Sequence, residues 1–247
     1  MSENLLTELA GAVLTDGLTF ANNAVASTAG AGLAAVLKAV MTRREKVARE
    51  TLLAELANTG RLPVDAEIDD CVAILYRYAR AAQEGTARLN LRLLAAVFAG
   101  QVREREIVAD DFLHYADMLA SLRRRDVVVL GTLLRITENA GDERLENAQK
   151  IHIAAIGELV PSVFDTAADY NATAAALQRT GLVVGVAMGG GFGPGGAAIL
   201  YRPTALLFEL HRLVDIEGVT ARDAAGTTPK ETSGHDRENG VSNAEQS

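Results

Sequence analysis

The chain has few aromatic residues, no tryptophan and a single cysteine. Aromatic side chains make up 4% of its 247 residues, whereas 49% of the residues are hydrophobic. A fold rich in β-sheet normally uses more aromatic and β-branched side chains, so this composition favours a helical core of small and aliphatic residues. Cys71 alone can form neither an internal disulfide nor a cysteine cage for a metal, which suits a reducing cytoplasm.

A basic stretch ahead of the first apolar segment is also missing, so no signal peptide is expected. The formal net charge of -8 disfavours non-specific nucleic-acid binding by the whole chain. Two short basic runs stand out against this acidic background, Thr42–Arg49 and Arg123–Arg125. Runs of this length are more typical of a solvated helix face or a charged helix end than of a binding site.

Catalytic and metal-binding motifs are missing as well. The four histidines form neither H-x-x-x-H nor H-E-x-x-H, and the chain has no G-x-S-x-G elbow and no Walker lysine. The acidic pairs Asp69–Asp70 and Asp110–Asp111 are typical of helix starts. The sequence therefore predicts a protein that is not an enzyme, with no catalytic residue, no metal site and no cofactor.

A glycine-rich stretch, MGGGFGPGG, begins at Met188 and matches G-x-G-x-x-G. A dinucleotide fingerprint needs a helix that starts at its third glycine, and Pro203 would interrupt such a helix. The chain also leaves no room for the further β-α units of a doubly wound sheet. We therefore interpret the stretch as the tip of a β-hairpin between the strands Leu182–Met188 and Ala197–Tyr201, with Thr204 as the cap of a following helix.

The remaining pattern is helical. The most apolar segment, Thr86–Ala99, is expected to be a central buried helix that ends at Gly100. The run DVVVLGTLLRI, from Asp126, suits either a strand or a helix, and its context favours a helix. The predicted fold is mainly α, a helical bundle in residues 1–120 followed by a winged helix-like module with a β-hairpin in residues 121–218.

The two ends of the chain differ in composition. After Val219 the sequence contains no aromatic residue, Leu, Ile or Met, so residues 219–247 are predicted to be a disordered tail. Residues 17–37 carry no charge over a length that could span a membrane, but two asparagines and three glycines make the segment a poor span. A packing helix is the favoured interpretation, and a membrane-associated effector that uses residues 17–37 is kept as an alternative.

The order of these patterns resembles the abortive-infection alpha-type family, bacterial proteins associated with resistance to phage. The resemblance rests on a small-residue N-terminal segment with a basic helix, on LNLRLLAAVFAGQ, on DDFLHYADMLASLRRRDVVVLGTLL and on the winged helix-like ending. It covers roughly residues 20–215 in outline. It implies a bacterial, helical protein that acts in phage defence, and it implies no catalytic residues.

The winged helix-like module raises the choice between DNA and protein as partner. Its candidate recognition helix, Val163–Arg179, carries more acid than base in its first half, which opposes phosphate binding. Winged helices also serve as docking and dimerisation modules, so a protein partner or a second copy of the chain is preferred, and a DNA-binding transcriptional regulator is the alternative. Gln178, Arg179 and Arg202 are the candidate contacts of the recognition helix and the wing.

Three polar residues interrupt the most apolar helix: Arg88, Asn90 and Arg92. Buried cations need partners, and Glu84, one turn before Arg88, would give a local ion pair. Asp69, Asp70 and Asp117 are further candidate partners. The sharper hypothesis is that Arg88, Asn90 and Arg92 form an anion-binding cluster.

Overall fold

The computed structural model describes residues 31–57, 59, 67–140, 145–187 and 199–225. Side chains are described from residue 38 in the first helix and from residue 148 in the helix that begins at residue 145. The predicted hairpin tip, most of the apolar segment 17–37 and residues 226–247 of the predicted tail lie outside these residues. Within them the protein is mainly helical, with nine α-helices and one small two-stranded antiparallel sheet late in the chain. The helical class and the late hairpin are therefore confirmed.

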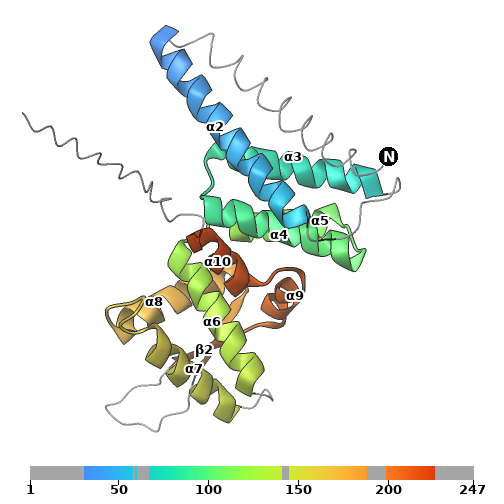
Figure 1. Cartoon of the computed structure of the whole chain (residues 1–247). Helices are drawn as coiled ribbons and strands as arrows, with labels where there is room; N and C mark the ends of the chain where they lie inside the picture. The colour runs from blue at the N-terminus through green and yellow to red at the C-terminus, as the bar shows by residue number, and fades with distance from the viewer. Residues whose placement is uncertain (1–30, 58, 60–66, 141–144, 188–198, 226–247) are drawn as a thin grey trace, which may run out of the picture.

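Four helices form the first half of the chain (upper part of Figure 1). They are α2 (Ala31–Leu56), α3 (Ile68–Glu84), α4 (Arg88–Glu104) and α5 (Ala109–Leu119). Helix α4 lies at their centre and contacts the other three. As predicted from its nearly continuous apolar pattern, it is buried on most sides, with 13 of its 17 residues buried.

The prediction that Gly100 ends this helix is wrong, because α4 continues to Glu104. Gly100 instead marks the place where α4 meets the backbone of the last part of the chain. A Cβ atom at Gly100 would lie 2.2 Å from the carbonyl oxygen of Leu213. Only a residue without a side chain permits this approach, so the glycine serves packing and not helix termination.

The second half contains the helices α6 (Arg124–Ala140), α7 (Leu145–Leu159) and α8 (Ala167–Leu177), and a 3-10 turn, η2 (Gln178–Thr180), extends α8. The ambiguous run after Asp126 is thus helical, as predicted. The candidate recognition helix begins later than Val163, because the Thr166 hydroxyl accepts a hydrogen bond from the backbone N–H of Asp169 and so caps α8.

The hairpin follows α8. Strands β1 (Val183–Ala187) and β2 (Ile199–Pro203) pair antiparallel, with Val183 opposite Pro203 and Ala187 opposite Ile199. Thr204 then caps helix α9 (Ala205–Leu213): its hydroxyl accepts from the backbone N–H of Leu207 at 3.4 Å. The predicted order of helix, strand, strand, capped helix is confirmed, while the winged helix assignment itself stays a prediction.

The predicted start of the tail at Val219 is wrong. Helix α10 (Ile216–Ala225) continues through residues 219–225 and lies between α4 and α6 (Figure 1). Val219 is completely buried and Asp223 is 4% exposed. The segment is therefore ordered by long-range packing despite its polar composition.

One core of buried apolar residues runs through both halves, from Leu52 in α2 to Val219 in α10. Helix α4 contacts both α9 and α10, so the bundle of residues 1–120 and the module of residues 121–218 share buried surface. The predicted boundary near residue 120 falls in the short connection between α5 and α6.

Candidate functional site

Arg88 and Arg92 of α4 face carboxylates from distant parts of the chain. Arg88 Nε lies 3.6 Å from one carboxylate oxygen of Asp223 in α10, and Arg124 of α6 lies 2.8 Å from the other. The Asp223 side chain is only 6% exposed. Its buried carboxylate therefore pairs with two guanidinium groups that come from two helices.

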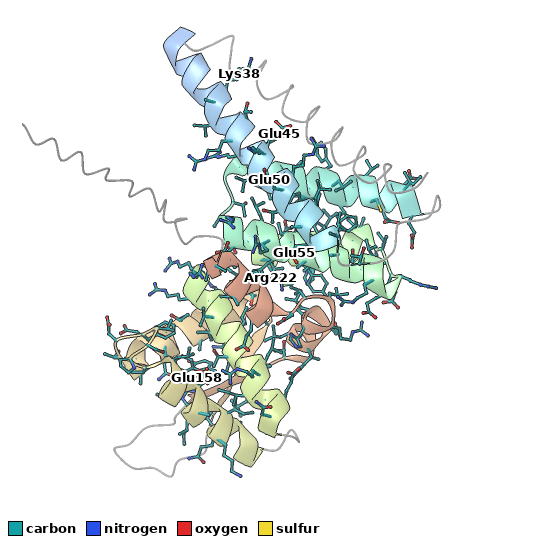
Figure 2. The ribbon with its side chains drawn as sticks, in the orientation of Figure 1. Lys38, Glu45, Glu50, Glu55, Glu158 and Arg222 are labelled. Atoms are coloured by element: carbon teal, nitrogen blue, oxygen red, sulfur yellow. The ribbon has the colours of Figure 1, made fainter. Side chains whose placement is uncertain are left out.

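One turn along α4, Arg92 takes part in a second group of the same kind. Its Nε lies 3.8 Å from a carboxylate oxygen of Glu55 in α2, whose other oxygen accepts from Arg222 of α10 at 3.0 Å. Figure 2 labels Glu55 and Arg222 where the end of α2 meets α10. The Arg92 and Glu55 side chains are 13% and 10% exposed.

Asn90 does not point to a ligand either. Its amide nitrogen donates to the carbonyl oxygens of Leu119 and Leu122 at 2.7 and 2.8 Å, and it also contacts that of Ala120 at 3.1 Å. These carbonyls end α5 and lead into α6, so Asn90 anchors the connection between the two halves.

The partners predicted for the arginines are occupied elsewhere. Glu84 pairs with Arg80 at 2.8 Å, Asp117 pairs with Arg77 at 2.9 Å, and Asp70 accepts from the backbone N–H of Ala109. The local ladder with Glu84 is therefore wrong as an account of Arg88. Because both arginines face buried acids, the contacts favour a structural clamp between α2, α4, α6 and α10 over an anion site.

A groove lies between the exposed face of α8, the end of α5 and the start of α6. Its volume is about 850 Å³. Arg123 and Arg125 line one side, Arg179 lines the end nearest the hairpin, and His114 contributes from α5. The triple arginine run, which the sequence alone made look like a helix end, thus stands beside the candidate recognition helix.

The charges along this groove are not equally free. Asp117 is held by Arg77, Asp126 accepts from the backbone N–H of Arg123 at 2.8 Å, and Asp169 accepts from the Thr166 hydroxyl at 2.7 Å. By contrast, no carboxylate of the described residues lies within ion-pair distance of Arg123, Arg125 or Arg179. The formal charges of the lining therefore balance, three arginines against three aspartates, but these arginines have no carboxylate within ion-pair distance among the described residues.

The face of α8 that lines this groove is made of short side chains. Ala168, Ala172 and Ala176 are exposed at successive turns, with Asp169 beside them, while Tyr170, Ala174 and Leu177 are buried on the other side. No arginine, lysine or glutamine stands on the exposed face within α8. Such a surface admits close approach of another backbone but has no long side chain with which to read base edges.

The three predicted contacts have different surroundings. Gln178 is exposed, but its amide oxygen accepts from the backbone N–H of Gly185 at 3.0 Å and so ties η2 to β1. Arg179 lines the groove, and its Nε donates to the Ala176 carbonyl. Arg202 stands in β2 opposite Val184, is partly buried and does not line this groove. The structure thus brings only Arg179 to the candidate surface.

Behind α8, three polar aromatic side chains connect the hairpin to the helices. The ring centre of His152 in α7 lies 5.6 Å from that of Tyr170 and 5.9 Å from that of Tyr201 in β2, and both pairs of rings are tilted. Burial lowers the pKa of His152, and burial followed by the nearby Tyr201 raises the pKa of Tyr170. Within the described part of the chain, His152 Nδ1 and the Tyr170 hydroxyl have no hydrogen-bond partner. The cluster is therefore suited to staying uncharged.

No group of three or more His, Cys, Asp or Glu side chains in the described ranges could hold a metal ion. No helix within these ranges is long and apolar enough to cross a membrane. The chain matches no family model, and comparisons with curated proteins and with solved structures gave no match.

Proposed function

We propose that this is a non-enzymatic interaction protein whose second half acts as a winged helix-like docking module. The order α6, α7, α8, hairpin supports this proposal, since three helices followed by a β-hairpin are the elements of such a module. The first half then serves as a rigid base, because α4 packs directly against α9 and α10.

The observation that carries the proposal is the composition of the groove over α8. Helix α8 lines it with the short side chains of Ala172, Thr173 and Ala176 and with Asp169. Its rim carries Arg123, Arg125 and Arg179 without carboxylate partners among the described residues. Small side chains allow a partner helix or strand to come close, and unpaired guanidinium groups favour acidic side chains on that partner. The surface therefore fits an acidic segment of a protein.

Photo-crosslinking from the groove floor tests the proposal. A photoreactive amino acid in place of Ala172 is expected to give a protein adduct in cells, whereas the same residue in place of exposed Ala224 of α10 is not. The adduct should weaken when Arg125→Glu reverses a rim charge and persist with Arg49→Glu, an exposed arginine of α2 far from the groove in the sequence. Equal adducts from both positions, or adducts insensitive to Arg125→Glu, would refute docking at this surface.

Duplex DNA is the second candidate partner. The three rim arginines beside α8 favour it, because phosphate contacts supply most of the affinity of non-specific DNA binding. The alanine face of α8 then predicts binding without sequence preference. Binding at low salt that weakens when Arg125 and Arg179 are neutralised, with a salt slope that falls by about 0.9 per lost phosphate contact, would support it. Absence of binding at low salt would exclude it.

The resemblance to the abortive-infection alpha-type family suggests the biological process in which the docking contact acts. It implies that the docking contact acts in resistance to phage. A host that expresses the wild-type chain should then give fewer plaques than one that expresses Arg125→Glu, with Arg49→Glu as the matched control. Equal plaque counts for the three strains would remove the phage-defence setting and leave the docking proposal to the crosslinking experiment.

A further inference from the structure

A second cleft lies on another part of the surface, where α5 and α9 meet the end of α4. Its volume is about 540 Å³, within the range of roughly 300–1,000 Å³ that small-molecule sites occupy. Carboxylates of Glu106, Asp111 and Glu209 line it, and they come from the connection after α4, from α5 and from α9. The cleft shares no lining residue with the groove over α8.

Within the described part of the chain these acids lack cationic partners. No Lys or Arg of the described residues lies within ion-pair distance of Glu106, Asp111 or Glu209. Arg212 is the one arginine among the lining residues, which also include a fourth acid, Glu138, whose carboxylate lies 3.3 Å from His211 Nε2. The cleft therefore has an excess of negative charge that the fold does not compensate.

A buried amide gives independent evidence that the cleft is built for a ligand. Gln101 of α4 is 2% exposed and lines the cleft. Its amide nitrogen donates to the Val108 carbonyl at 3.1 Å, but its amide oxygen is buried and has no hydrogen-bond partner among the described residues. Buried polar atoms without partners are rare in proteins, and this one is an acceptor that a ligand N–H could satisfy.

The remaining wall is aromatic and apolar. Tyr115, 8% exposed, lines the cleft together with Phe208 and Leu213. Burial, and after it the carboxylates of Glu209 and Asp111, raise the pKa of Tyr115, so both acids lie close enough to act on its hydroxyl. Aromatic faces next to carboxylates bind organic ammonium groups well, because the ring attracts the cation while the acids neutralise it.

From these observations we propose that the cleft binds a small organic polyamine, an alkyl chain that carries two or more ammonium groups. The charged ends would pair with the carboxylates of Glu106, Asp111 and Glu209 and donate to the Gln101 amide oxygen, and the methylene chain would lie on Phe208 and Leu213. A bare divalent cation fits less well, because none of the described acids are grouped closely enough to coordinate a metal ion. This binding site is separate from the docking groove, and either proposal can fail alone.

Calorimetric titration of the full chain with spermidine and with diaminohexane tests the proposal, with hexanediol as the uncharged analogue and Mg²⁺ as the competing inorganic cation. Saturable binding of both amines, no binding of hexanediol and no displacement by an equal concentration of Mg²⁺ are expected. Displacement by Mg²⁺ at that concentration would show a diffuse counterion effect and overturn the proposal, as would the absence of binding.

Paired variants locate the site. Asp111→Asn and Glu209→Gln should each raise the Kd for spermidine by about three- to tenfold, the effect of losing one close charge pair at a partly solvated site. Asp110→Asn is the matched control, because Asp110 is exposed on the same turn of α5, changes the net charge equally and does not line the cleft. An equal change in Kd for Asp110→Asn and Asp111→Asn would overturn the proposal.

Gln101→Met separates hydrogen bonding from charge. It keeps the length of the side chain and removes the unpartnered acceptor, so spermidine should bind several-fold more weakly although the charge of the cleft is unchanged. Unaltered affinity in a folded Gln101→Met protein would remove the amide from the site and overturn the assignment. If this buried variant does not fold, the exposed variants at Asp111 and Glu209 still decide the result.

Discussion

The buried carboxylate of Asp223 is the most direct test of the clamp between the two halves of the chain. Asp223→Asn keeps the size of the side chain and removes its charge. In the wild-type protein this carboxylate is 6% exposed and is shared by Arg124 at 2.8 Å and Arg88 at 3.6 Å. The substitution therefore removes the negative charge that both guanidinium groups face at Asp223.

The loss of stability depends on how well water can solvate each guanidinium group after the carboxylate is removed. Loss of one member of a fully buried ion pair costs about 3–5 kcal/mol, because the remaining charge stays unsolvated. The Arg88 and Arg124 side chains are 39% and 51% exposed, so both can turn partly toward water. We therefore expect a smaller loss in the free energy of unfolding, about 2 kcal/mol. For a chain of this size that corresponds to a fall in Tm of roughly 4–8 °C.

Urea unfolding followed by circular dichroism measures the change directly. Asp110→Asn, an exposed acid of α5, is the control and should alter the free energy of unfolding by less than about 0.5 kcal/mol. A wild-type Tm in the Asp223→Asn protein would mean that α10 does not dock on α4 and α6. The interpretation of residues 219–225 as part of the fold would then be refuted.

Two further substitutions test other parts of the packing. Gly100→Ala should lower the free energy of unfolding by about 2–4 kcal/mol, because its Cβ would meet the Leu213 backbone at 2.2 Å. Gly157→Ala, whose Cβ would meet nothing within 4 Å, should instead stabilise helix α7 by about 0.5–1 kcal/mol, and similar Tm values for both variants would contradict the close approach of α4 and α9. Burial lowers the pKa of His152, so the unfolded chain binds the proton more readily, and stability should fall as the pH drops below about 6.5. His152→Phe should remove that part of the fall in Tm on acidification, and an unchanged pH dependence in this variant would show that other groups cause it.

Those elements with a strong local signal could be predicted from the sequence. The apolar character of Leu89–Val102 persists on every side of a helix, and only a central helix can bury such a surface. The hairpin followed from a change of period on both sides of the glycines, and the α9 start followed from Thr204, whose hydroxyl satisfies a free N–H of the first turn. In each case a short stretch of sequence contains the whole cause.

The wrong predictions concern residues whose surroundings come from a distant part of the chain. Gly100 has the local signature of a helix end, but its reason is the Leu213 carbonyl, more than a hundred residues later. Likewise the composition of residues 219–247 is that of a disordered tail. The first seven of these residues nevertheless belong to a helix in which Val219 and Asp223 are buried. No local pattern distinguishes these cases, because their cause is tertiary contact.

The same limitation governs the candidate sites. The partners of Arg88 and Arg92 could not be chosen from their neighbours, since Asp223 and Glu55 reach them from the two ends of the described chain. Because residues 219–247 are predicted to be a tail, Asp223 is not among the candidate partners of Arg88, which are Glu84, Asp69, Asp70 and Asp117. The prediction of a tail at one end of the chain therefore leaves out the partner of an arginine in the central helix.

Net charge is a poor guide to partners for the same reason. The value of -8 is the sum over the whole chain, whose surface carries two local clusters of charge of opposite sign. Arg123, Arg125 and Arg179 stand unpaired beside α8, while Glu106, Asp111 and Glu209 stand unpaired beside α9. At physiological ionic strength charges more than about 8 Å apart are largely screened, so a ligand at either surface responds to its own cluster and hardly to the sum. An acidic protein can therefore bind an acidic partner at one surface and a polyamine at the other, and only the positions of the charges predict which ligand goes where.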